Sequence, residues 1–293
     1  MKLKQFILLA ALGLTATAML TSCEDILGHW EKPTPATPGT TPTPASYVMA
    51  ADATEADKGK LICTDGHIHA NGADAECTKD RVAMIVYVGS EGETDATYNH
   101  GLAIALSDAS TGAKWGANGT GDNLAELTDY TTWCSATPAA TDADTDMAGI
   151  ANTTVLVAMA GSDASNYQAG KAAADYKNSV AAPEGTSDWF LPSAGQWYKF
   201  FNGMCGLTWS QSDPGFGWAT GGSDNLDAAN KAFEDAGYDS AKFDGTGTGT
   251  YYWSSSEHDD VNAVLVLFHS SGGVRVNTGS KSNSYRVRSF LAF

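Results

Sequence analysis

Apolar and polar residues alternate in two regions of the chain, a pattern typical of short β-strands. Between residues 60 and 107, apolar runs at 82–88 and 102–106 are separated by turns rich in Gly and Asp. After residue 245 similar short runs recur, at 252–256, 263–268, 273–277 and 285–291. This spacing predicts β-strands in both regions, forming an antiparallel sheet in the second.

Helical periodicity marks the middle of the chain. Ser193 follows Pro192 and stands three positions before Gln196, the capping-box arrangement that satisfies free backbone N–H groups where a helix starts. Apolar side chains then recur at helical spacing and predict one buried stripe. The stripe consists of Trp197, Phe200, Phe201 and Met204.

Two further helices are predicted on either side of this one. The first begins at Asp163 or Ser165 and runs through Tyr176, with Ala169 and Ala173 along the same face as Tyr176. The other begins at Ser223 and stops at Gly237. Its inward face consists of Leu226, Ala229 and Phe233. Helices between two strand-forming regions predict a mixed α+β domain that ends in antiparallel sheet.

The N-terminus has the layout of a signal peptide. Two lysines precede an apolar stretch at residues 6–20, and small and polar residues separate that stretch from Cys23. The stretch is shorter than the roughly 20 residues that cross a bilayer. The tetrad Leu-Thr-Ser-Cys that ends at Cys23 resembles the bacterial lipobox. We therefore expect removal of residues 1–22 and lipidation of Cys23. The alternative is an ordinary secretory signal with a cysteine near its cleavage site.

Residues 23–46 are expected to form an extended stalk. Glu24 and Asp25 resemble the acidic tag that sends some lipoproteins to the outer face of the outer membrane. From residue 32 onward this segment is mostly Pro and Thr, a composition typical of extended spacers. Residues 47–293 are enough for one sizeable core, which predicts a single domain. We expect this domain to be lipid-anchored to the outer membrane of a Gram-negative bacterium and exposed at the cell surface.

The chain is strongly acidic, with a formal net charge of -17 at pH 7. Loss of Lys2 and Lys4 with the signal peptide would lower this charge further. Such a surface repels nucleic acid and anionic lipid headgroups. We therefore expect no nucleic-acid partner, and contact with the membrane only through the lipid anchor. Plain solubility explains the acidity better than any specific acidic function.

Four cysteines remain besides Cys23, in what would be an oxidising compartment: Cys63, Cys77, Cys134 and Cys205. Up to two disulfides are possible among three pairings, and Cys63 with Cys77 is the simplest pair. His67 and His69 could bind zinc together with these two thiols. However, alternate residues on a strand share a face with or without metal, and the spacing matches no familiar structural zinc pattern. We therefore predict no metal site.

The chain contains no catalytic constellation that can be named. It has no Gly-x-Ser-x-Gly elbow and no Walker phosphate loop. Residues 142–146 begin like a calcium loop, but Met147 replaces the required Gly and Thr153 stands where a bidentate Glu belongs. Glu257 and His258 are neighbours and would face opposite sides of a strand, so they would not serve one substrate. We expect neither enzymatic activity nor a cofactor.

Three motifs carry a resemblance to a known family. They are Asp188-Trp189-Phe190-Leu191-Pro192-Ser193, Tyr252-Trp253-Ser254-Ser255-Ser256-Glu257 and Tyr285-Arg286-Val287-Arg288. Over residues 58–293 the chain resembles the C-type-lectin-like domains of bacterial surface lipoproteins related to the formylglycine-generating enzyme fold. Within that superfamily it is most similar to the variable proteins of diversity-generating retroelements. The resemblance implies a C-type-lectin-like fold of mixed helices and short antiparallel strands.

The resemblance also implies which residues form the framework and which ones vary to bind ligand. Framework positions would be Trp189, Pro192, Trp253, Ser254, Glu257, Ala263, Phe268, Lys281, Asn283, Arg286 and Arg288. Ligand-binding positions would be His258, Asp259, Asp260, Val261, Asn262, Leu265, Leu267, His269, Arg275, Asn277 and Thr278. Gly279 and Ser282 also fall where relatives vary. In those relatives the template codon at variable positions encodes Asn. Mutating only its adenines cannot yield Lys, Glu, Gln, Met or Trp, none of which occurs in this second set.

The leucines of this set admit two interpretations. Leu265 and Leu267 could lie exposed on one face of a strand, with Val264 and Val266 facing inward. Alternatively, the whole strand is buried on both faces. The sequence does not decide between these two interpretations of the leucines. Residues 258–262 are polar, as is typical of loops, which favours their exposure.

The chain departs from two branches of the superfamily. The oxidase branch uses a cysteine pair late in its chain, and no cysteine follows Cys205 here. Calcium-dependent sugar-binding lectins use a Glu-Pro-Asn or Trp-Asn-Asp site, and neither tripeptide occurs. We therefore expect a surface-anchored lipoprotein that binds a protein or glycan ligand through a patch within residues 258–282. A structural or fimbria-type envelope component is the alternative, and a degenerate oxidase-fold enzyme ranks third.

Overall fold

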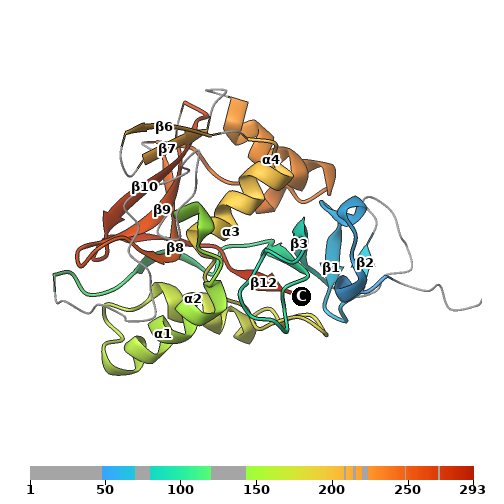
Figure 1. The fold of residues 1–293 in the computed structure, drawn as a ribbon, viewed down its shortest axis with the longest axis horizontal. Helices are drawn as coiled ribbons and strands as arrows, with labels where there is room; N and C mark the ends of the chain where they lie inside the picture. The colour runs from blue at the N-terminus through green and yellow to red at the C-terminus, as the bar shows by residue number, and fades with distance from the viewer. Residues whose placement is uncertain are drawn as a thin grey trace, which may run out of the picture. The chain divides into compact units, whose positions relative to one another are not determined.

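The strand-forming regions produce two β-sheets, and helices from the middle of the chain pack against them (Figure 1). The computed structural model describes residues 48–69, 80–119, 143–207, 209–213, 216–219, 224–247, 249–269 and 271–293. Contacts group Ser46–Phe293 as one compact unit. The predicted signal peptide, the lipidation site Cys23 and the stalk lie outside the described residues, as do Cys77 and Cys134.

The smaller sheet has five strands in the order β12-β4-β3-β1-β2, with antiparallel neighbours throughout. The strands are β1 (Leu61–Cys63), β2 (Ile68–His69), β3 (Arg81–Val88), β4 (Gly101–Ala105) and β12 (Phe290–Ala292). In β3, Met84 and Val86 join one core cluster, while Ala83 and Ile85 join another. The continuous apolar run of β3 is therefore explained by burial on both faces.

The larger sheet has seven strands in the order β5-β11-β8-β9-β10-β7-β6. The strands are β5 (Ser110–Lys114), β6 (Trp209–Asp213), β7 (Phe216–Ala219), β8 (Thr250–Glu257), β9 (Asn262–Phe268), β10 (Val274–Ser280) and β11 (Ser284–Val287). The pairing of β8 with β11 is parallel, and the other pairings are antiparallel. The α+β class expected from the sequence is confirmed, with a mixed rather than purely antiparallel C-terminal sheet.

The last predicted strand, residues 285–291, is in fact two strands that belong to different sheets. β11 pairs with β5 and β8 in the larger sheet, whereas β12 pairs with β4 in the smaller one. The chain crosses between the sheets at Arg288 and Ser289, which are both buried. The apolar-polar alternation breaks at Arg288 and Ser289. Such a break does not reveal a change of sheet, because side-chain period does not record which strand is the partner.

Four α-helices accompany the sheets in the described part of the chain: α1 (Gly149–Ser162), α2 (Ala169–Asp175), α3 (Ala194–Tyr198) and α4 (Asn225–Asp235). A π-helical segment, η5 (Lys199–Met204), continues α3. Short 3-10 turns lie at η1 (Ala50–Asp52), η2 (Glu55–Asp57), η3 (Ala143–Thr145), η4 (Tyr176–Asn178) and η7 (Asp239–Ala241). None of the helices among the described residues is long and apolar enough to span a bilayer.

The predicted helix start at Ser193 is confirmed. Ser193 and Gln196 form the capping box, and the Ser193 backbone N–H donates to Gln196 Oε1 at 2.9 Å. Trp197, Phe200 and Phe201 are fully buried as predicted, and Met204 packs partly buried against the same core. The Trp197 ring stacks on Phe201 at 5.7 Å between centroids, so the stripe forms the aromatic centre of the largest core cluster.

The other two helix predictions meet different outcomes. α4 buries Ala229 and Phe233 as expected and ends before Gly237, whose φ of +75° favours glycine. The helix predicted from Asp163 or Ser165 instead begins at Ala169, and the preceding residues form turns. The sequence analysis missed α1 altogether. Its run of Thr and Val has β-branched side chains, which favour strands.

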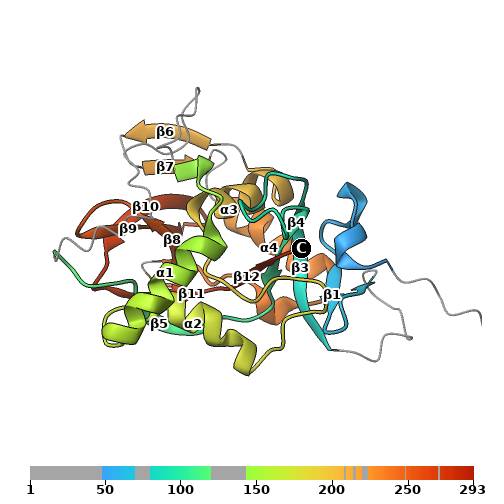
Figure 2. The ribbon, with the colours of Figure 1, turned by 60° about the horizontal axis from the view of Figure 1, so that its bottom comes forward.

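α1 and α2 lie side by side on the flank of the larger sheet, near β5 and β11 (Figures 1 and 2). Leu156 of α1 and Ala169 and Ala173 of α2 are buried in one cluster with Leu265 and Leu267 of β9. The layer formed by α1 and α2 therefore shields part of the larger sheet from solvent.

Candidate functional site

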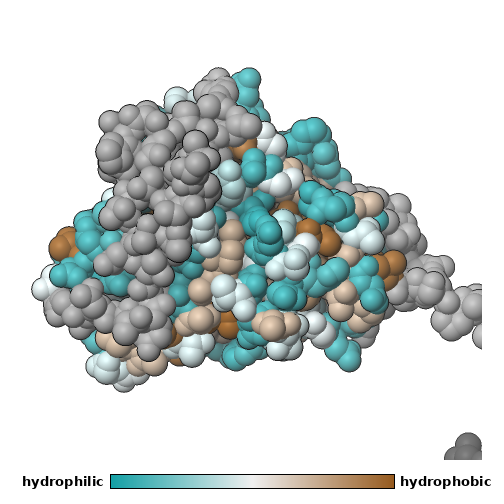
Figure 3. Space-filling view, viewed as in Figure 1, coloured by the Kyte–Doolittle hydropathy of each residue, from teal (hydrophilic) through white to brown (hydrophobic). Residues whose placement is uncertain are grey.

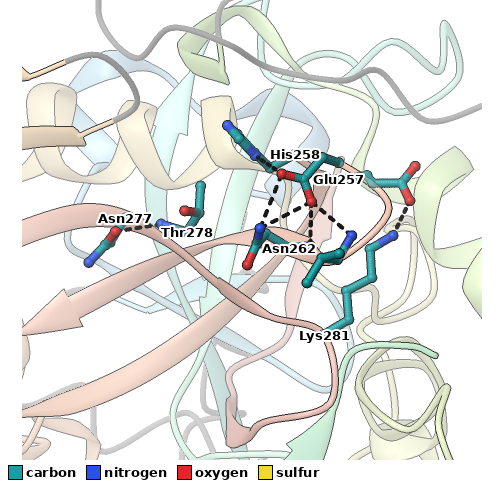
Figure 4. A network of polar contacts seen from close by, with 8 residues as sticks. Glu257, His258, Asn262, Asn277, Thr278 and Lys281 are labelled. Carbon is teal, nitrogen blue, oxygen red and sulfur yellow. Dashed lines mark hydrogen bonds and ion pairs between the residues drawn. The ribbon is translucent and has the colours of Figure 1, made fainter. Parts of the chain in front are cut away.

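The loop that joins β8 to β9, residues 258–261, is held in shape together with Asn262, the first residue of β9, by Asp259. Its Oδ1 accepts the backbone N–H groups of Val261 at 2.8 Å and Asn262 at 2.7 Å. The Asn262 side-chain amide and a ring nitrogen of His258 also contact this carboxylate (Figure 4). Burial acts to raise the pKa of Asp259, but these hydrogen bonds outweigh it and lower the pKa to about 2.

A buried ion pair lies directly beneath the β8–β9 loop. Lys281 Nζ contacts Glu257 Oε1, and the two side chains are 3% and 2% exposed (Figure 4). The ammonium also lies 5.1 Å from the centre of the Trp115 ring. The Lys281 backbone N–H donates to the Val261 carbonyl at 2.8 Å. The Asp260 carbonyl in turn accepts from the Gly119 N–H at 3.2 Å. The loop is therefore fixed to two other segments of the chain.

The first two family-like motifs meet at Asp146. Ser256 Oγ donates to Asp146 Oδ2 at 2.5 Å, and the Asn152 amide donates to the same oxygen at 3.1 Å. Ser193 Oγ donates to the Asp146 carbonyl at 2.6 Å, while the Ala194 N–H donates to Ser256 Oγ at 2.9 Å. These buried bonds tie the start of α3 to the end of β8.

The third motif is anchored by Asp108. Arg286 Nη1 and Arg288 Nε donate to its two carboxylate oxygens at 2.9 and 2.6 Å. The hydrogen bond to Asp108 raises the pKa of Arg286. Tyr252 also bonds to Asp108, and burial raises the pKa of this tyrosine to about 12. The sequence did not reveal these roles: Asp108 was not singled out, and Asp146 was considered only as part of a failed calcium-loop match.

Most of the remaining expected framework residues are buried, and their polar groups form hydrogen bonds inside the protein. The bonds are Trp189 Nε1 to the Val180 carbonyl (2.8 Å), Trp253 Nε1 to the Ala113 carbonyl (2.8 Å), Ser254 Oγ to the Val264 carbonyl (2.8 Å) and the Ser255 N–H to the Pro192 carbonyl (2.8 Å). Ala263 and Phe268 are fully buried, whereas Asn283 is exposed and donates to Tyr285 Oη at 2.8 Å.

The structure divides the residues expected to bind ligand into three groups. Asp260 and Val261 are exposed. The half-buried residues are His258, Asp259, Asn262, His269, Arg275, Asn277 and Thr278. Leu265 and Leu267 are buried, with 1% and 4% exposure. The interpretation that placed these two leucines on an exposed face is therefore wrong, and the alternative, a strand buried on both faces, is confirmed.

These leucines are buried in a cluster that includes residues of α1 and α2, and of these two helices α1 was not predicted from the sequence. Leu265 and Leu267 pack in one cluster with Trp115, Trp253 and Leu156 of α1. The opposite face of β9 contributes Val264, Val266 and Phe268 to the largest cluster. With helices on one side and the aromatic core on the other, β9 has no face left for a ligand.

Residues of β10 border the same face. Arg275 and Asn277 stand opposite Leu267 and Leu265 in the β9–β10 register and remain half-buried. A Cβ at Gly279 would lie 2.7 Å from Leu265 Cδ2, so a larger residue at this position would require the buried Leu265 side chain to shift. Of the positions expected to vary on β10, Gly279 is therefore constrained by the fold.

Among the described residues, exposed large hydrophobic side chains are Val48, Val157 and Val261, and Val261 is 40% exposed. Figure 3 shows the hydrophobic residues of one face as separate small patches among hydrophilic ones. The β8–β9 loop therefore combines an exposed apolar side chain with the exposed carboxylate of Asp260.

Glu257 and His258 do not converge on a common point. Glu257 contacts Lys281 in the interior, while His258 contacts Asp259 in the half-exposed loop. This is the opposed arrangement expected of strand neighbours. The pair gives no geometry for acid-base chemistry on one substrate.

The described chain is thus an α+β protein built from a five-stranded and a mixed seven-stranded sheet. No family model matches the chain, and no curated protein matches it. Its structure is similar to that of a fimbrial protein from Bacteroides ovatus ATCC 8483, with a TM-score of 0.51 and 17% sequence identity. The match covers 80% of this chain and 48% of the fimbrial protein. The chain therefore spans about half the length of that neighbour, and the likeness concerns the fold alone.

Proposed function

We propose that this protein is a surface-tethered recognition protein whose β8–β9 loop presents the contact surface. One observation carries the proposal: the loop exposes Asp260 and Val261, although hydrogen bonds and a buried ion pair fix it from beneath. A surface held in its bound shape before contact loses little conformational entropy on binding. An exposed apolar side chain next to a carboxylate suits a protein or glycan partner.

The proposed contact surface is smaller than the one expected from the sequence. It consists of His258, Asp260 and Val261. Thr278 and Asn277 follow along β10 from the end nearest the loop, and Arg275 lies farther away, opposite Leu267. Leu265 and Leu267 are excluded because they are buried. Asp259 and Asn262 act indirectly, because their side chains bond to each other and shape the loop.

We assign the chain to the C-type-lectin-like variable proteins as part of the same proposal. This assignment is supported by the contacts that join the three motifs in the structure. Ser193 and Ser256 both donate to Asp146, and Tyr252 pairs with Arg286 across β8 and β11. Variation restricted to exposed loop residues would change the contact surface without disturbing these bonds.

The tether is proposed from the sequence. Lipidation of Cys23 would anchor the protein to the outer membrane. A Pro-rich segment of 15 residues in extended conformation spans roughly 45 Å, at about 3.1 Å per residue. That distance would hold the domain clear of the lipid headgroups.

A second candidate function, as a fimbria-type envelope component, is favoured by the likeness to the Bacteroides ovatus fimbrial protein. It makes a different prediction, because a subunit would associate with copies of itself or with other envelope proteins without any external ligand. Sedimentation of the purified chain over a range of concentrations separates the two. A monomer at high micromolar concentration favours recognition, and concentration-dependent polymers favour assembly.

The recognition proposal is tested with two matched double variants. Asp260→Asn with Val261→Asn alters the loop, and Val48→Asn with Asp52→Asn makes the same replacements at exposed positions near the start of the domain. Binding to a glycan array and to a panel of bacterial and host surface proteins is measured for both. The proposal expects at least a tenfold loss of binding for the loop variant alone, with thermal midpoints unchanged. Equal binding by both variants contradicts it.

A further inference from the structure

A second cluster of chemically reactive side chains lies apart from the β8–β9 loop, in the hairpin of β1 and β2. Cys63 ends β1, His67 lies immediately before β2, and His69 lies in β2. The hairpin register pairs Leu61 with His69, and the Cys63 N–H donates to the His67 carbonyl at 3.0 Å. Cys63 and His67 are therefore cross-strand neighbours, and His69 shares their face because strand side chains alternate.

The cluster has the geometry of a three-ligand metal site. Each residue offers one ligand atom, and these atoms all lie within 4.8 Å of one another. Tetrahedral zinc with Zn–S near 2.3 Å and Zn–N near 2.0 Å requires ligand atoms roughly 3.3–3.6 Å apart. Small side-chain rotations would bring the three ligand atoms from their present separations to these distances. Cys63, His67 and His69 are all buried, so an ion here would be shielded from solvent.

His69 supplies an independent observation. Its side chain is 1% exposed, yet neither ring nitrogen has a hydrogen-bond partner among the residues that the structure describes. A buried polar group without a partner is destabilising by about 1–3 kcal/mol, so native proteins rarely keep one without a reason. A metal ion bound by one of these nitrogens would satisfy that nitrogen and remove part of the cost.

His67 has the support that metal-binding histidines usually have. Its Nδ1 contacts Asp65 Oδ1. A carboxylate on one ring nitrogen fixes the tautomer and orientation of the imidazole and directs the other nitrogen to the metal. The His67 and His69 rings lie 5.8 Å apart between centroids.

Packing and backbone hydrogen bonds hold the β1–β2 turn in place, and this turn positions Cys63, His67 and His69. Gly66 has a φ of +82°, and a Cβ there would lie 2.2 Å from the Glu184 carbonyl oxygen. Backbone hydrogen bonds tie the turn to three other segments: Ala50 N–H to the Gly66 carbonyl (2.9 Å), Thr64 N–H to the Asp80 carbonyl (3.0 Å) and Glu184 N–H to the Thr64 carbonyl (3.3 Å). Ligands on such a supported turn are held ready for an ion.

We propose that Cys63, His67 and His69 bind a structural Zn²⁺ ion. Cys63 contributes its thiolate sulfur, and its proton leaves to solvent when the metal binds. His67 binds through Nε2, and His69 binds through one ring nitrogen. A water molecule or another oxygen ligand completes the tetrahedron. No metal site was predicted from the sequence, because the spacing of these residues matches no familiar zinc pattern. The spacing also does not show that the ring nitrogens of His69 are buried without a hydrogen-bond partner among the described residues. The ion would fasten the edge of the five-stranded sheet, independently of the proposed recognition function.

The test measures metal in the full chain purified in detergent without added chelator. Elemental analysis should find one zinc per chain after gel filtration. Removal of zinc should lower the thermal midpoint, and its return at a hundredfold excess over its dissociation constant should restore roughly 5–10 °C. Cobalt in place of zinc should give a thiolate-to-metal charge-transfer band. Cys63→Ser should abolish this band, and His69→Gln should lower zinc content at least tenfold. His100→Gln, at an exposed histidine, should leave zinc content unchanged.

Several results would overturn the proposal. One is a purified wild-type protein that contains less than a tenth of an equivalent of zinc and whose thermal midpoint does not change when zinc is added. This result is informative even if a variant fails to fold, because it uses the wild-type protein. A second is full zinc content in both His69→Gln and Cys63→Ser. A third is a disulfide that joins Cys63 to another cysteine in the native protein, detected by peptide mapping without reduction. Copper at the same residues would refute the choice of ion.

Discussion

The buried ion pair beneath the β8–β9 loop makes a strong energetic prediction. Lys281→Met keeps most of the aliphatic stem and its packing on Trp115 but removes the ammonium that contacts Glu257. The Glu257 carboxylate then remains in the interior, 1% exposed, without that positive charge. We expect the single variant to be destabilised far more than a surface substitution would be.

The size of the effect follows from burial. Removing one member of a buried ion pair costs about 3–5 kcal/mol, because an uncompensated charge stays in a medium of low polarity. For a domain of this size each kcal/mol lowers the thermal midpoint by roughly 2–4 °C, so we expect a decrease of about 6–20 °C. Replacing both partners, as Glu257→Leu with Lys281→Met, removes the isolated charge. That double variant should recover to within about 1–2 kcal/mol of the wild type.

Urea unfolding followed by tryptophan fluorescence measures these differences. The control is Lys171→Met, because Lys171 pairs with Asp175 on the surface of α2, where the side chains are 51% and 46% exposed. An exposed pair of this kind contributes about 0.3–0.5 kcal/mol. The reasoning is refuted if Lys281→Met costs no more than Lys171→Met, or if the double variant is as unstable as the sum of its single changes.

Three other predictions follow from the same structure. Leu265→Ala should cost about 2–5 kcal/mol of unfolding free energy because it opens a cavity in the buried cluster that Leu265 shares with Trp115 and Trp253. Val261→Ala should change the unfolding free energy by no more than about 0.5 kcal/mol, and similar values for the two variants in denaturant unfolding would contradict the burial of Leu265. The carboxylate of Asp259, with its pKa lowered to about 2, contributes stability that is present above pH 4 and lost as the pH falls toward 2. Asp259→Asn should lack this part of the acid dependence, and an unchanged acid-unfolding profile would count against the bonds described. Cys23→Ala should move the protein from the membrane to the soluble fraction, as immunoblots of fractionated cells would show, and retention in the membrane would disprove the lipid anchor.

Local signals predicted much of the fold. Strand periodicity located β3, β4, β8, β9 and β10 to within two residues at most ends, and the Ser193–Gln196 capping box located the start of α3. These features are encoded by neighbouring residues, so they can be read without knowing the tertiary structure. The two strands at the C-terminus could not be separated in this way, because their partners lie about 180 residues earlier in the chain.

The candidate site was predictable only in part. Polarity correctly indicated exposure for Asp260 and Val261. The two leucines of β9 were misjudged in part because they share a buried cluster with Leu156 of α1, a helix with a β-branched sequence that was not recognised. The roles of Asp108 and Asp146 depend on segments distant in sequence, so no local pattern could have indicated them.

The central claim is that the C-terminal segment separates residues that the fold requires from residues that it only displays. A surface-displayed library that varies residues 257–282 one position at a time, sorted for folding by resistance to protease, tests this directly and needs no ligand. The account predicts that Asp260 and Val261 accept nearly every residue, whereas Glu257, Leu265 and Lys281 accept few. If Asp260 and Val261 prove as intolerant as Leu265, these residues are part of the framework, and the β8–β9 loop is not a replaceable recognition surface.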